Sequence, residues 1–305
     1  MEINLNTLFV LTQGAYVHRD HNTVKVDIEQ QTRLAVPIHT LESLAVFGNV
    51  MVSPGLMGLC AEQGIAVSFL SMNGRLLARV DAPSTGNVLL RRQQFRLADQ
   101  PTACLAIARN IAAGKLQNAR TMLLRSARDA ADESDSKVLQ AAAGQIAATI
   151  QSLPTVATLD ELRGHEGEAA KLYFDVFTNM IHADREAFAM TKRTRRPPQD
   201  RINSLLGFAY ALLLHDCSAA LTAAGLDVSV GFFHADRPGK PSLALDLMEE
   251  FRSILADRLV LAMVNRKQVA ANDFNLRDGG AVEMTDAARK AFITAYQQRK
   301  AEGIK

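Results

Sequence analysis

Three segments of the chain carry side chains of the kind that bind divalent metal ions, and each also has a plainer structural explanation. The first runs from Arg163 to Glu168 and reads RGHEGE, within a stretch whose apolar residues have helical spacing. Gly164 and Gly167, on either side of Glu166, leave room for a large ligand to approach its carboxylate oxygens. The alternative is a solvated glutamate near a helix N-terminus, where the helix dipole favours negative charge.

The second segment places a histidine where an apolar run ends. Gly231, Phe232 and Phe233 precede His234, and the polar run from Ala235 to Lys240 follows it. An imidazole in this position can offer one ring nitrogen to a metal ion. A hydrogen-bonded histidine with a structural role is the alternative, and the segment alone leaves both open.

The third segment contains two carboxylates three residues apart, Asp246 and Glu249. Residues at this spacing share one face of a helix. Two like charges there repel each other unless a cation lies between them or nearby. The alternative is an acidic surface face that Arg252 partly neutralises, and the spacing does not separate the two.

Together the three segments supply four candidate catalytic residues, Glu166, His234, Asp246 and Glu249. Carboxylate oxygens with one imidazole suit Mg²⁺ or Mn²⁺ better than zinc. Such an ion polarises a scissile phosphate, lowers the pKa of an attacking hydroxyl or water, and stabilises the leaving oxygen. No phosphate-binding P-loop, dinucleotide fingerprint or GxSxG nucleophile motif is present as a competing site.

A fourth segment, from Thr191 to Pro198, concerns binding rather than catalysis. Its two prolines predict an extended, non-helical chain. Arginine and lysine side chains in such a loop match phosphate oxygens, although a solvated charged loop is an equal alternative. The candidate DNA-binding residues are Lys192, Arg193, Arg195 and Arg196. A second basic group is more simply explained as exposed helix arginines; it comprises Arg75, Arg79, Arg91, Arg92 and Arg96.

The composition is that of a globular chain. It has 305 residues, 48% of them hydrophobic and 22% charged, with a net charge of +2, so any basic patch must be local.

Cys60, Cys104 and Cys217 form no CxxC pair and are expected to be buried free thiols in a reducing compartment. The first residues lack the pattern of a signal peptide, and no apolar run approaches the roughly 20 residues of a membrane helix. These features favour a cytoplasmic protein that does not contact a membrane.

The elements that must position these residues change in character along the chain. Strand patterns predominate up to about residue 80, with a hairpin at residues 15–28 and one helix from Ser53 to Glu62. Helical patterns follow, at residues 87–97, 102–113, 116–130, 137–153, 159–180 (broken at its two glycines), 203–221 and 246–264. Residues 132–136 and 191–201 are expected to be exposed. We predict an α+β protein, with a β-rich N-terminal domain at residues 1–85 and an all-α catalytic domain at residues 86–305.

With these residues in place, the sequence closely resembles the CRISPR-associated integrase of the adaptation complex, in the form found with subtype I-C systems. The resemblance extends over most of the chain in family order; its runs are NTLFV at residues 6–10, SPGLM at 53–57, GNVLLRRQ at 86–93, RGHEGEAA at 163–170, RRPP at 195–198 with Asp200 and Asn203, GFFH at 231–234 and LDLME at 245–249.

The resemblance implies roles for residues and partners that spacing alone does not give. It implies that Glu166, His234 and Glu249 bind the metal, with Asp246 as the supporting acid. Some relatives have Asp at the position of Glu249, whose side chain is one methylene longer. It also implies a homodimer formed through the N-terminal domains, and a small ferredoxin-like partner that bridges two such dimers.

The leading hypothesis is therefore a metal-dependent DNA endonuclease and integrase that inserts spacers into a CRISPR array. Its substrates would be double-stranded DNA, both the prespacer and the repeat. One alternative is a non-catalytic DNA-binding scaffold whose acidic cluster is structural. Another is a metallohydrolase of a small substrate, against which the basic segment argues because it favours a polyanion.

Overall fold

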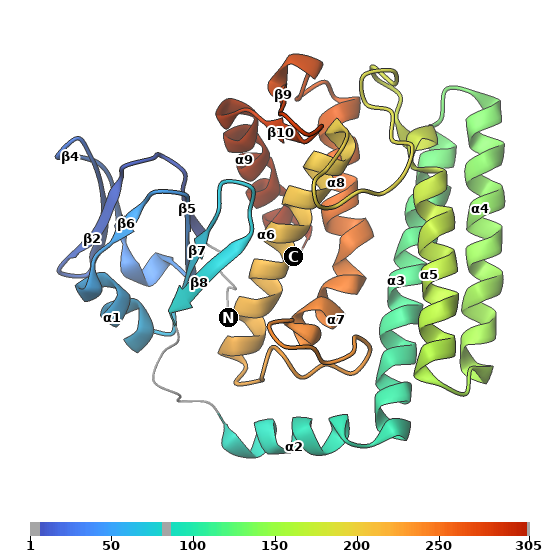
Figure 1. Ribbon diagram of the computed structural model, residues 1–305, viewed down its shortest axis with the longest axis horizontal. Coiled ribbons are helices and arrows are strands. Elements are labelled where there is room, and N and C mark those ends of the chain that lie inside the picture. Colours follow the sequence, from blue (N-terminus) through green and yellow to red (C-terminus); the bar gives the residue numbers. More distant parts are fainter. Residues whose placement is uncertain (1–6, 81–86, 304–305) are drawn as a thin grey trace.

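Two small sheets precede a group of helices in this protein (Figure 1). The structure is a computed structural model that describes residues 7–80 and 87–303. The first sheet has parallel strands β1, β5 and β7, with β8 antiparallel at its edge. Its strands are β1 (Thr7–Val10), β5 (Ser43–Phe47), β7 (Ala66–Leu70) and β8 (Leu76–Val80). The second sheet has the order β4 (Gln31–Pro37), β3 (Thr23–Ile28), β2 (Tyr16–Asp20) and β6 (Met51–Val52).

Alternating apolar residues build the core that both sheets share. Val24 and Val26 of β3 are buried while Lys25 between them is not, as the alternation predicts. They pack in one cluster with Leu44 of β5 and Leu56 of helix α1 (Pro54–Glu62). The predicted start of α1 is confirmed, because the Ser53 side chain accepts a hydrogen bond from the Leu56 backbone N–H at 3.2 Å. A 3-10 turn, η1 (Ile38–Thr40), lies between β4 and β5 in the chain.

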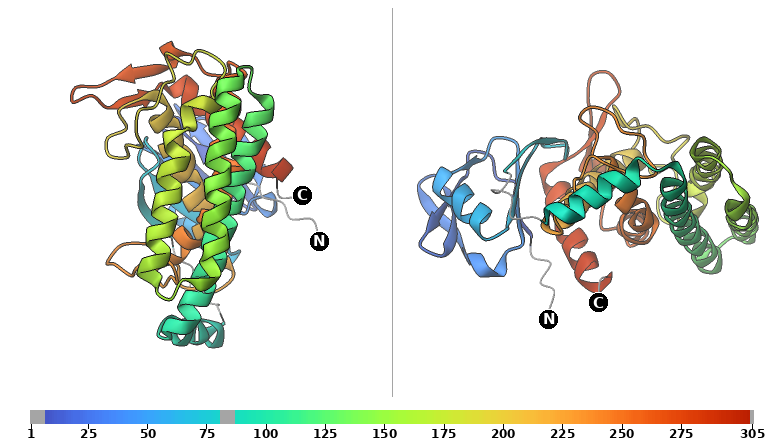
Figure 2. Two further views of the ribbon diagram at one scale, coloured as in Figure 1. Left: turned by 90° about the vertical axis from the view of Figure 1, so that its right-hand side faces the viewer. Right: turned by 90° about the horizontal axis from the view of Figure 1, so that it is seen from below.

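The helical part contains upright helices at its outer edge and a long central helix next to the sheets (Figures 1 and 2). Its helices are α2 (Val88–Ala98), α3 (Pro101–Asp129), α4 (Glu133–Ser152), α5 (Leu159–Asp175), α6 (Arg201–Ala223), α7 (Ser242–Phe251), α8 (Arg258–Asn265) and α9 (Asp286–Gly303). Shorter turns are η2 (Leu153–Thr155), η3 (Phe177–Met180), the π-helical η4 (Arg252–Asp257) and η5 (Ala271–Asp273). The predicted α+β fold, with strands first and helices after, is confirmed.

Several predicted boundaries differ from the observed ones because packing overrides local propensity. Residues 102–113 and 116–130 form one continuous helix, α3, although Gly114 costs about 1 kcal/mol in a helix interior. Helix α5 likewise runs through Gly164 and Gly167 without a break. The predicted helix at residues 246–264 starts earlier, at Ser242, and contains the π-helical turn η4. A hairpin of β9 (Phe274–Leu276) and β10 (Val282–Met284) lies in the part predicted to be all helical.

One residue in a stretch predicted to be exposed is buried. The side chain of Asp135 accepts hydrogen bonds from Asn179 Nδ2 at 2.6 Å and from Arg185 Nη2 at 2.5 Å. Its partners lie more than 40 residues away in sequence. The other residues at 132–136 are exposed or half-buried, so the prediction is wrong only at Asp135.

The expectation that no apolar segment is long enough to span a membrane is wrong for helix α6. Within residues 7–80 and 87–303, its 23 residues have the length and apolar composition of a membrane span, and half of the most apolar stretch is buried in the protein. Core helices share those properties. In this protein α6 packs against α7, η4, α8 and β10, and its Asp216 accepts from Lys300 at 3.2 Å and from Tyr296 at 2.8 Å.

The three cysteines are buried and free, as predicted. Cys60 lies in the core of the β-rich part, whereas Cys217 lies in the core of the helical part. Burial raises the pKa of the Cys60 thiol to about 11 and that of the Cys217 thiol to about 12. Burial also raises the pKa of Cys104, whose sulfur donates to the Ala98 carbonyl at 3.1 Å.

The hairpin of β7 and β8 meets α6 at the turn residue Gly74. A Cβ atom at Gly74 would lie 2.8 Å from the Ala211 Cβ and 3.3 Å from the Phe208 ring, and the φ angle is +80°. Beside this contact, Asn73 Nδ2 donates to Glu283 Oε1 at 2.8 Å. The β-rich part therefore packs directly on the helical part, while the predicted domain boundary at residues 85–86 lies outside the described residues.

Substituting Gly74 tests this contact. Gly74→Ala should lower the free energy of unfolding by about 1–3 kcal/mol more than Gly64→Ala, measured by urea denaturation. Both glycines have a positive φ angle, but a Cβ at Gly64 would meet nothing within 4 Å. The difference between the variants therefore isolates the overlap with α6. Equal losses in the two variants would show that the turn does not press on that helix.

Candidate active site

The structure brings the four candidate catalytic residues into one cluster. Glu166 lies in the middle of α5, His234 lies in the segment before α7, and Asp246 and Glu249 lie on α7. His234 Nε2 is 3.6 Å from Glu249 Oε1. The link to Glu166 is made by Lys115 of α3, whose ammonium contacts Glu166 Oε1 and lies 2.6 Å from Glu249 Oε2. Residues from three distant segments therefore meet, as the sequence predicts.

Asp246 fixes the position of the histidine. Its side chain is 1% exposed, and its two oxygens accept the backbone N–H groups of Phe232, Phe233 and His234 at 2.6, 3.0 and 2.9 Å. Asp246 Oδ1 also lies 2.7 Å from His234 Nδ1. With Nδ1 engaged in this way, Nε2 is the ring nitrogen left for a metal ion. Gly231 is needed beside it, because a Cβ there would lie 2.9 Å from Asp246 Oδ2.

Glu249 is kept ionised by the cations around it. Its side chain is 2% exposed, and burial alone would raise the pKa of this carboxyl. Arg252, whose Nη1 is 2.9 Å from Glu249 Oε1, and Lys115 together hold its pKa below the ordinary value. The group is thus a carboxylate at neutral pH, which is the form that binds a divalent cation.

Lys115 is the site residue that the sequence did not reveal. It lies in an alanine-rich stretch of α3 with no motif around it, and both carboxylates that it contacts are distant in sequence. Among the described residues no group of three His, Cys, Asp or Glu side chains is arranged to hold a metal ion as it stands. The Lys115 ammonium lies between the two glutamates. The donor set itself, two carboxylates and an imidazole Nε2 oriented by a third carboxylate, fits Mg²⁺ or Mn²⁺.

A buried acid lies behind the cluster. Asp257, at the end of the π-helical turn η4, accepts hydrogen bonds from the hydroxyls of Tyr210 at 2.6 Å and Tyr173 at 3.0 Å. Burial raises the pKa of Asp257 to about 6. The Tyr210 ring also contacts two guanidinium groups, with Arg252 at 5.1 Å and Arg193 at 5.3 Å from its centroid. A π-helical turn beside a candidate site is a recurrent feature of functional sites.

The structure divides the four candidate DNA-binding residues into two kinds. Lys192, Arg195 and Arg196 are exposed on the segment before α6. Arg193 points inward instead, where its Nη1 donates to Asn203 Oδ1 and to the Thr194 carbonyl, both at 2.6 Å. Burial lowers the pKa of Arg193. Its observed partners are therefore protein groups, while the other three side chains face outward.

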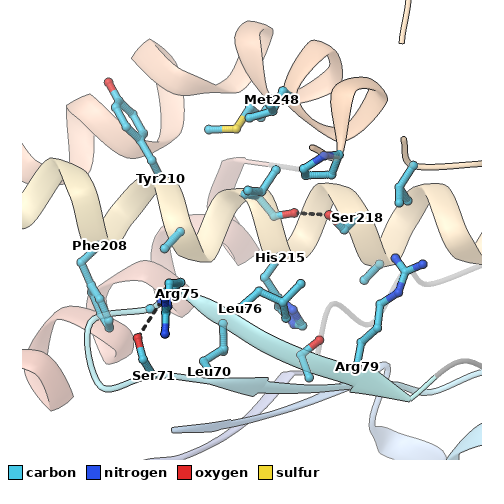
Figure 3. A pocket seen from close by; sticks show the side chains of 18 of the residues that line it. Leu70, Ser71, Arg75, Leu76, Arg79, Phe208, Tyr210, His215, Ser218 and Met248 are labelled. Carbon is cyan, nitrogen blue, oxygen red and sulfur yellow. Dashed lines mark hydrogen bonds between the residues drawn. The ribbon is translucent and has the colours of Figure 1, made fainter. Parts of the chain in front are cut away.

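A cleft of about 1450 Å³ lies between β8 and α6. Figure 3 shows Arg79 reaching into it from the strand and His215 from the helix. Eight arginines line the cleft, from β8 and the turn before it, α2, the segment before α6, η4 and α9, namely Arg75, Arg79, Arg91, Arg193, Arg195, Arg196, Arg252 and Arg289. The first three belong to the group that the sequence explained as surface arginines. Arg252 and Met248 connect this cleft to the acidic cluster, although Glu166 and His234 are not part of its lining. A polyanion is the ligand class that such a lining suits.

The comparisons with known proteins agree on one family. A family model described as CRISPR associated protein Cas1 matches residues 8–298. The CRISPR-associated endonuclease Cas1 1 of Chlorobaculum tepidum is 48% identical over 304 residues, which cover 100% of this chain and 89% of that protein. The protein of the same name from Moorella thermoacetica is 46% identical over 304 residues, with the same coverage of 100% and 89%.

Solved structures show the same fold. A Cas1 protein from Thermotoga maritima superposes with a TM-score of 0.85 at 22% identity, covering 98% of this chain and 91% of that one. A casposase bound to its integration product superposes with a TM-score of 0.81 at 21% identity, covering 97% of this chain and 82% of that one. At these identities the likeness concerns the fold.

Neutralising Asp257 should make stability less dependent on pH. Its folded-state pKa of about 6 lies above the ordinary 3.8, so its contribution to stability is present below pH 4 and is lost as pH rises through 6. Wild type should therefore lose on the order of 3 kcal/mol relative to Asp257→Asn between pH 4 and pH 7. Urea denaturation at four pH values measures this difference. A difference that stays constant with pH would contradict the raised pKa.

Proposed function

Because this chain belongs to the Cas1 family of CRISPR-associated proteins, we propose that it is a metal-dependent DNA endonuclease and integrase that inserts new spacers into a CRISPR array. The observation that carries the proposal is the convergence of Glu166, His234 and Glu249, with Asp246 holding the imidazole. The printed names of the two bacterial relatives include the word endonuclease. The casposase of the same fold was solved with an integration product.

In this proposal Glu166, Glu249 and His234 Nε2 hold Mg²⁺ or Mn²⁺. When bound, the ion polarises the scissile phosphate and lowers the pKa of the attacking hydroxyl. Asp246 keeps the imidazole oriented through Nδ1, and Arg252 keeps Glu249 ionised. The 3′-hydroxyl of a prespacer would attack a phosphodiester at the repeat end, so that a new P–O bond forms as the P–O3′ bond of the repeat strand breaks and releases a 3′-hydroxyl. Cleavage would be the same displacement with water as nucleophile.

The finer features of the proposal concern assembly. We propose that residues 1–85 form the dimerisation domain of a homodimer and that residues 86–305 form the catalytic domain. Two of the superposed structures are Cas6-RT-Cas1–Cas2 complexes, with TM-scores of 0.83 and 0.64. Their printed names support a second CRISPR-associated protein as a partner for this chain, and we propose that this partner is a small ferredoxin-like protein. A cytoplasmic location and a subtype I-C system are part of the same proposal.

A non-catalytic DNA-binding scaffold is the second candidate. One observation favours it, namely that Lys115 gives Glu166 and Glu249 a structural partner. The scaffold would need no metal, so activity in the presence of Mn²⁺ separates the two candidates. Hydrolysis of a small substrate is less well supported, because exposed arginines line the neighbouring cleft.

Replacing His234 separates catalysis from folding. His234→Ala should lower half-site integration by about 100-fold or more, because it removes a metal ligand. The assay contains the purified protein, its small partner, Mn²⁺ and a plasmid that carries a repeat. His182→Ala is a matched control, because His182 is exposed and outside the cluster. Undiminished integration by His234→Ala would exclude the proposed metal site.

The exposed arginines should bind phosphate without reading base sequence. The double variant Arg195→Ala, Arg196→Ala should weaken DNA binding and reduce the slope of log K against log salt by about two units, one per lost contact. Fluorescence anisotropy at several salt concentrations measures the slope. Lys137→Ala serves as a control, because Lys137 is 74% exposed on α4 and pairs with Glu133. An unchanged slope would mean that this segment is only a solvated surface.

A further inference from the structure

Helix α3 is held close to α7 at the point where it carries Lys115. Gly114 permits the approach, since a Cβ there would lie 3.1 Å from Glu250 Cγ. One turn further along, Asn118 Nδ2 donates to the Glu250 carbonyl at 2.8 Å. Lys115 lies between these two contacts, and its side chain is 12% exposed. Its backbone is therefore fixed beside the acidic cluster, and only the side chain is free to change position.

The charges of the cluster do not balance if the ammonium stays there with a divalent ion. Arg252 already pairs with Glu249 at 2.9 Å. With the metal present, Lys115, Arg252 and the ion would bring four positive charges to a cluster whose carboxylates, Glu166, Asp246 and Glu249, carry three negative charges. The ammonium contacts one oxygen of each of the two carboxylates that would hold the ion. Lys115 and the ion therefore compete for one position.

A small space lies beside the Lys115 side chain, on the side of Asp257. A cavity of about 30 Å³ is lined by Lys115 together with Tyr173, Tyr210, Arg252 and Asp257. Asp257 is the only carboxyl group in that lining. A space of this size holds one water molecule or a comparable polar group.

We propose that Lys115 is a two-position residue that holds Glu166 and Glu249 together without metal and moves toward Asp257 when the ion binds. The proposal rests on the proposed function, because it takes the two glutamates as metal ligands. In the first position Lys115 prevents the repulsion of two poorly solvated carboxylates. In the second it leaves their oxygens free. Lys115 is a positioning residue here, since it acts through the ligands.

The first test is Lys115→Met, which keeps the length of the side chain and removes its charge. Mn²⁺ binding to the full chain without DNA, measured by calorimetry, should tighten by about tenfold, because no ion pair must be displaced. The melting temperature of the metal-free protein should fall in the same variant, because the two carboxylates then repel each other. Lys171→Met is the matched control, since Lys171 is 78% exposed on α5 and pairs with Asp175. Lys115→Gln replaces the variant if it fails to fold.

The second test asks whether Asp257 receives the Lys115 ammonium. Asp257→Asn should weaken Mn²⁺ binding in the wild-type background, because it removes the acid that receives the ammonium. The same substitution should have no effect on Mn²⁺ binding in the Lys115→Met background. This double-mutant cycle isolates the coupling between the two residues.

Each result supports or overturns the inference. Unchanged or weaker Mn²⁺ binding by Lys115→Met would overturn the competition. Equal weakening by Asp257→Asn in both backgrounds would overturn the second position. Absence of Mn²⁺ binding by wild type and Lys115→Met alike would overturn the whole inference. Failure of the proposed function is a different result, namely Mn²⁺ binding without integration activity.

Discussion

The hydrogen bonds that end on the Asp246 carboxylate hold the candidate ligand His234 beside helix α7. Three consecutive backbone N–H groups and one imidazole nitrogen converge on its two oxygens. A buried carboxylate without these partners would be costly, and three unpaired backbone N–H groups would be costly too. Each side therefore requires the other. These bonds hold the segment before α7 against that helix. Because the backbone of His234 is fixed in this way, the position of its imidazole is fixed too.

Around this fixed point the site is a balance of buried charges. Glu249 is tolerated in the interior because Arg252 and Lys115 compensate it, and Arg252 is in turn placed by the ring of Tyr210. Removing one partner from such a group leaves an uncompensated charge in a poorly solvated place. The residues of the cluster are thus energetically coupled, and the effects of substituting neighbours should not add.

The sequence predicted the order of strands and helices, and it singled out candidate residues that the structure brings together, for a physical reason. Strand alternation, helical periodicity and the cap at Ser53 are local signals, so these elements are visible in a short window of sequence. Glu166, His234 and Asp246 were recognised because each lies in a motif with its own neighbours. Lys115 and the inward turn of Arg193 were not, because both depend on partners brought near by tertiary packing. The burial of Asp135 and the continuity of α3 also depend on tertiary packing, so neighbouring residues in the sequence do not predict them.

The three cysteines have a practical consequence for studying assembly and motion. A thiol reacts with maleimides and other electrophiles as its thiolate, and burial keeps Cys60, Cys104 and Cys217 protonated at neutral pH. A single cysteine introduced on the surface would therefore be the preferred site for a fluorophore or spin label in the otherwise native chain. A pair of introduced cysteines, one on the sheets and one on the helices, would make the distance between these two parts measurable by spectroscopy without first removing the natural thiols.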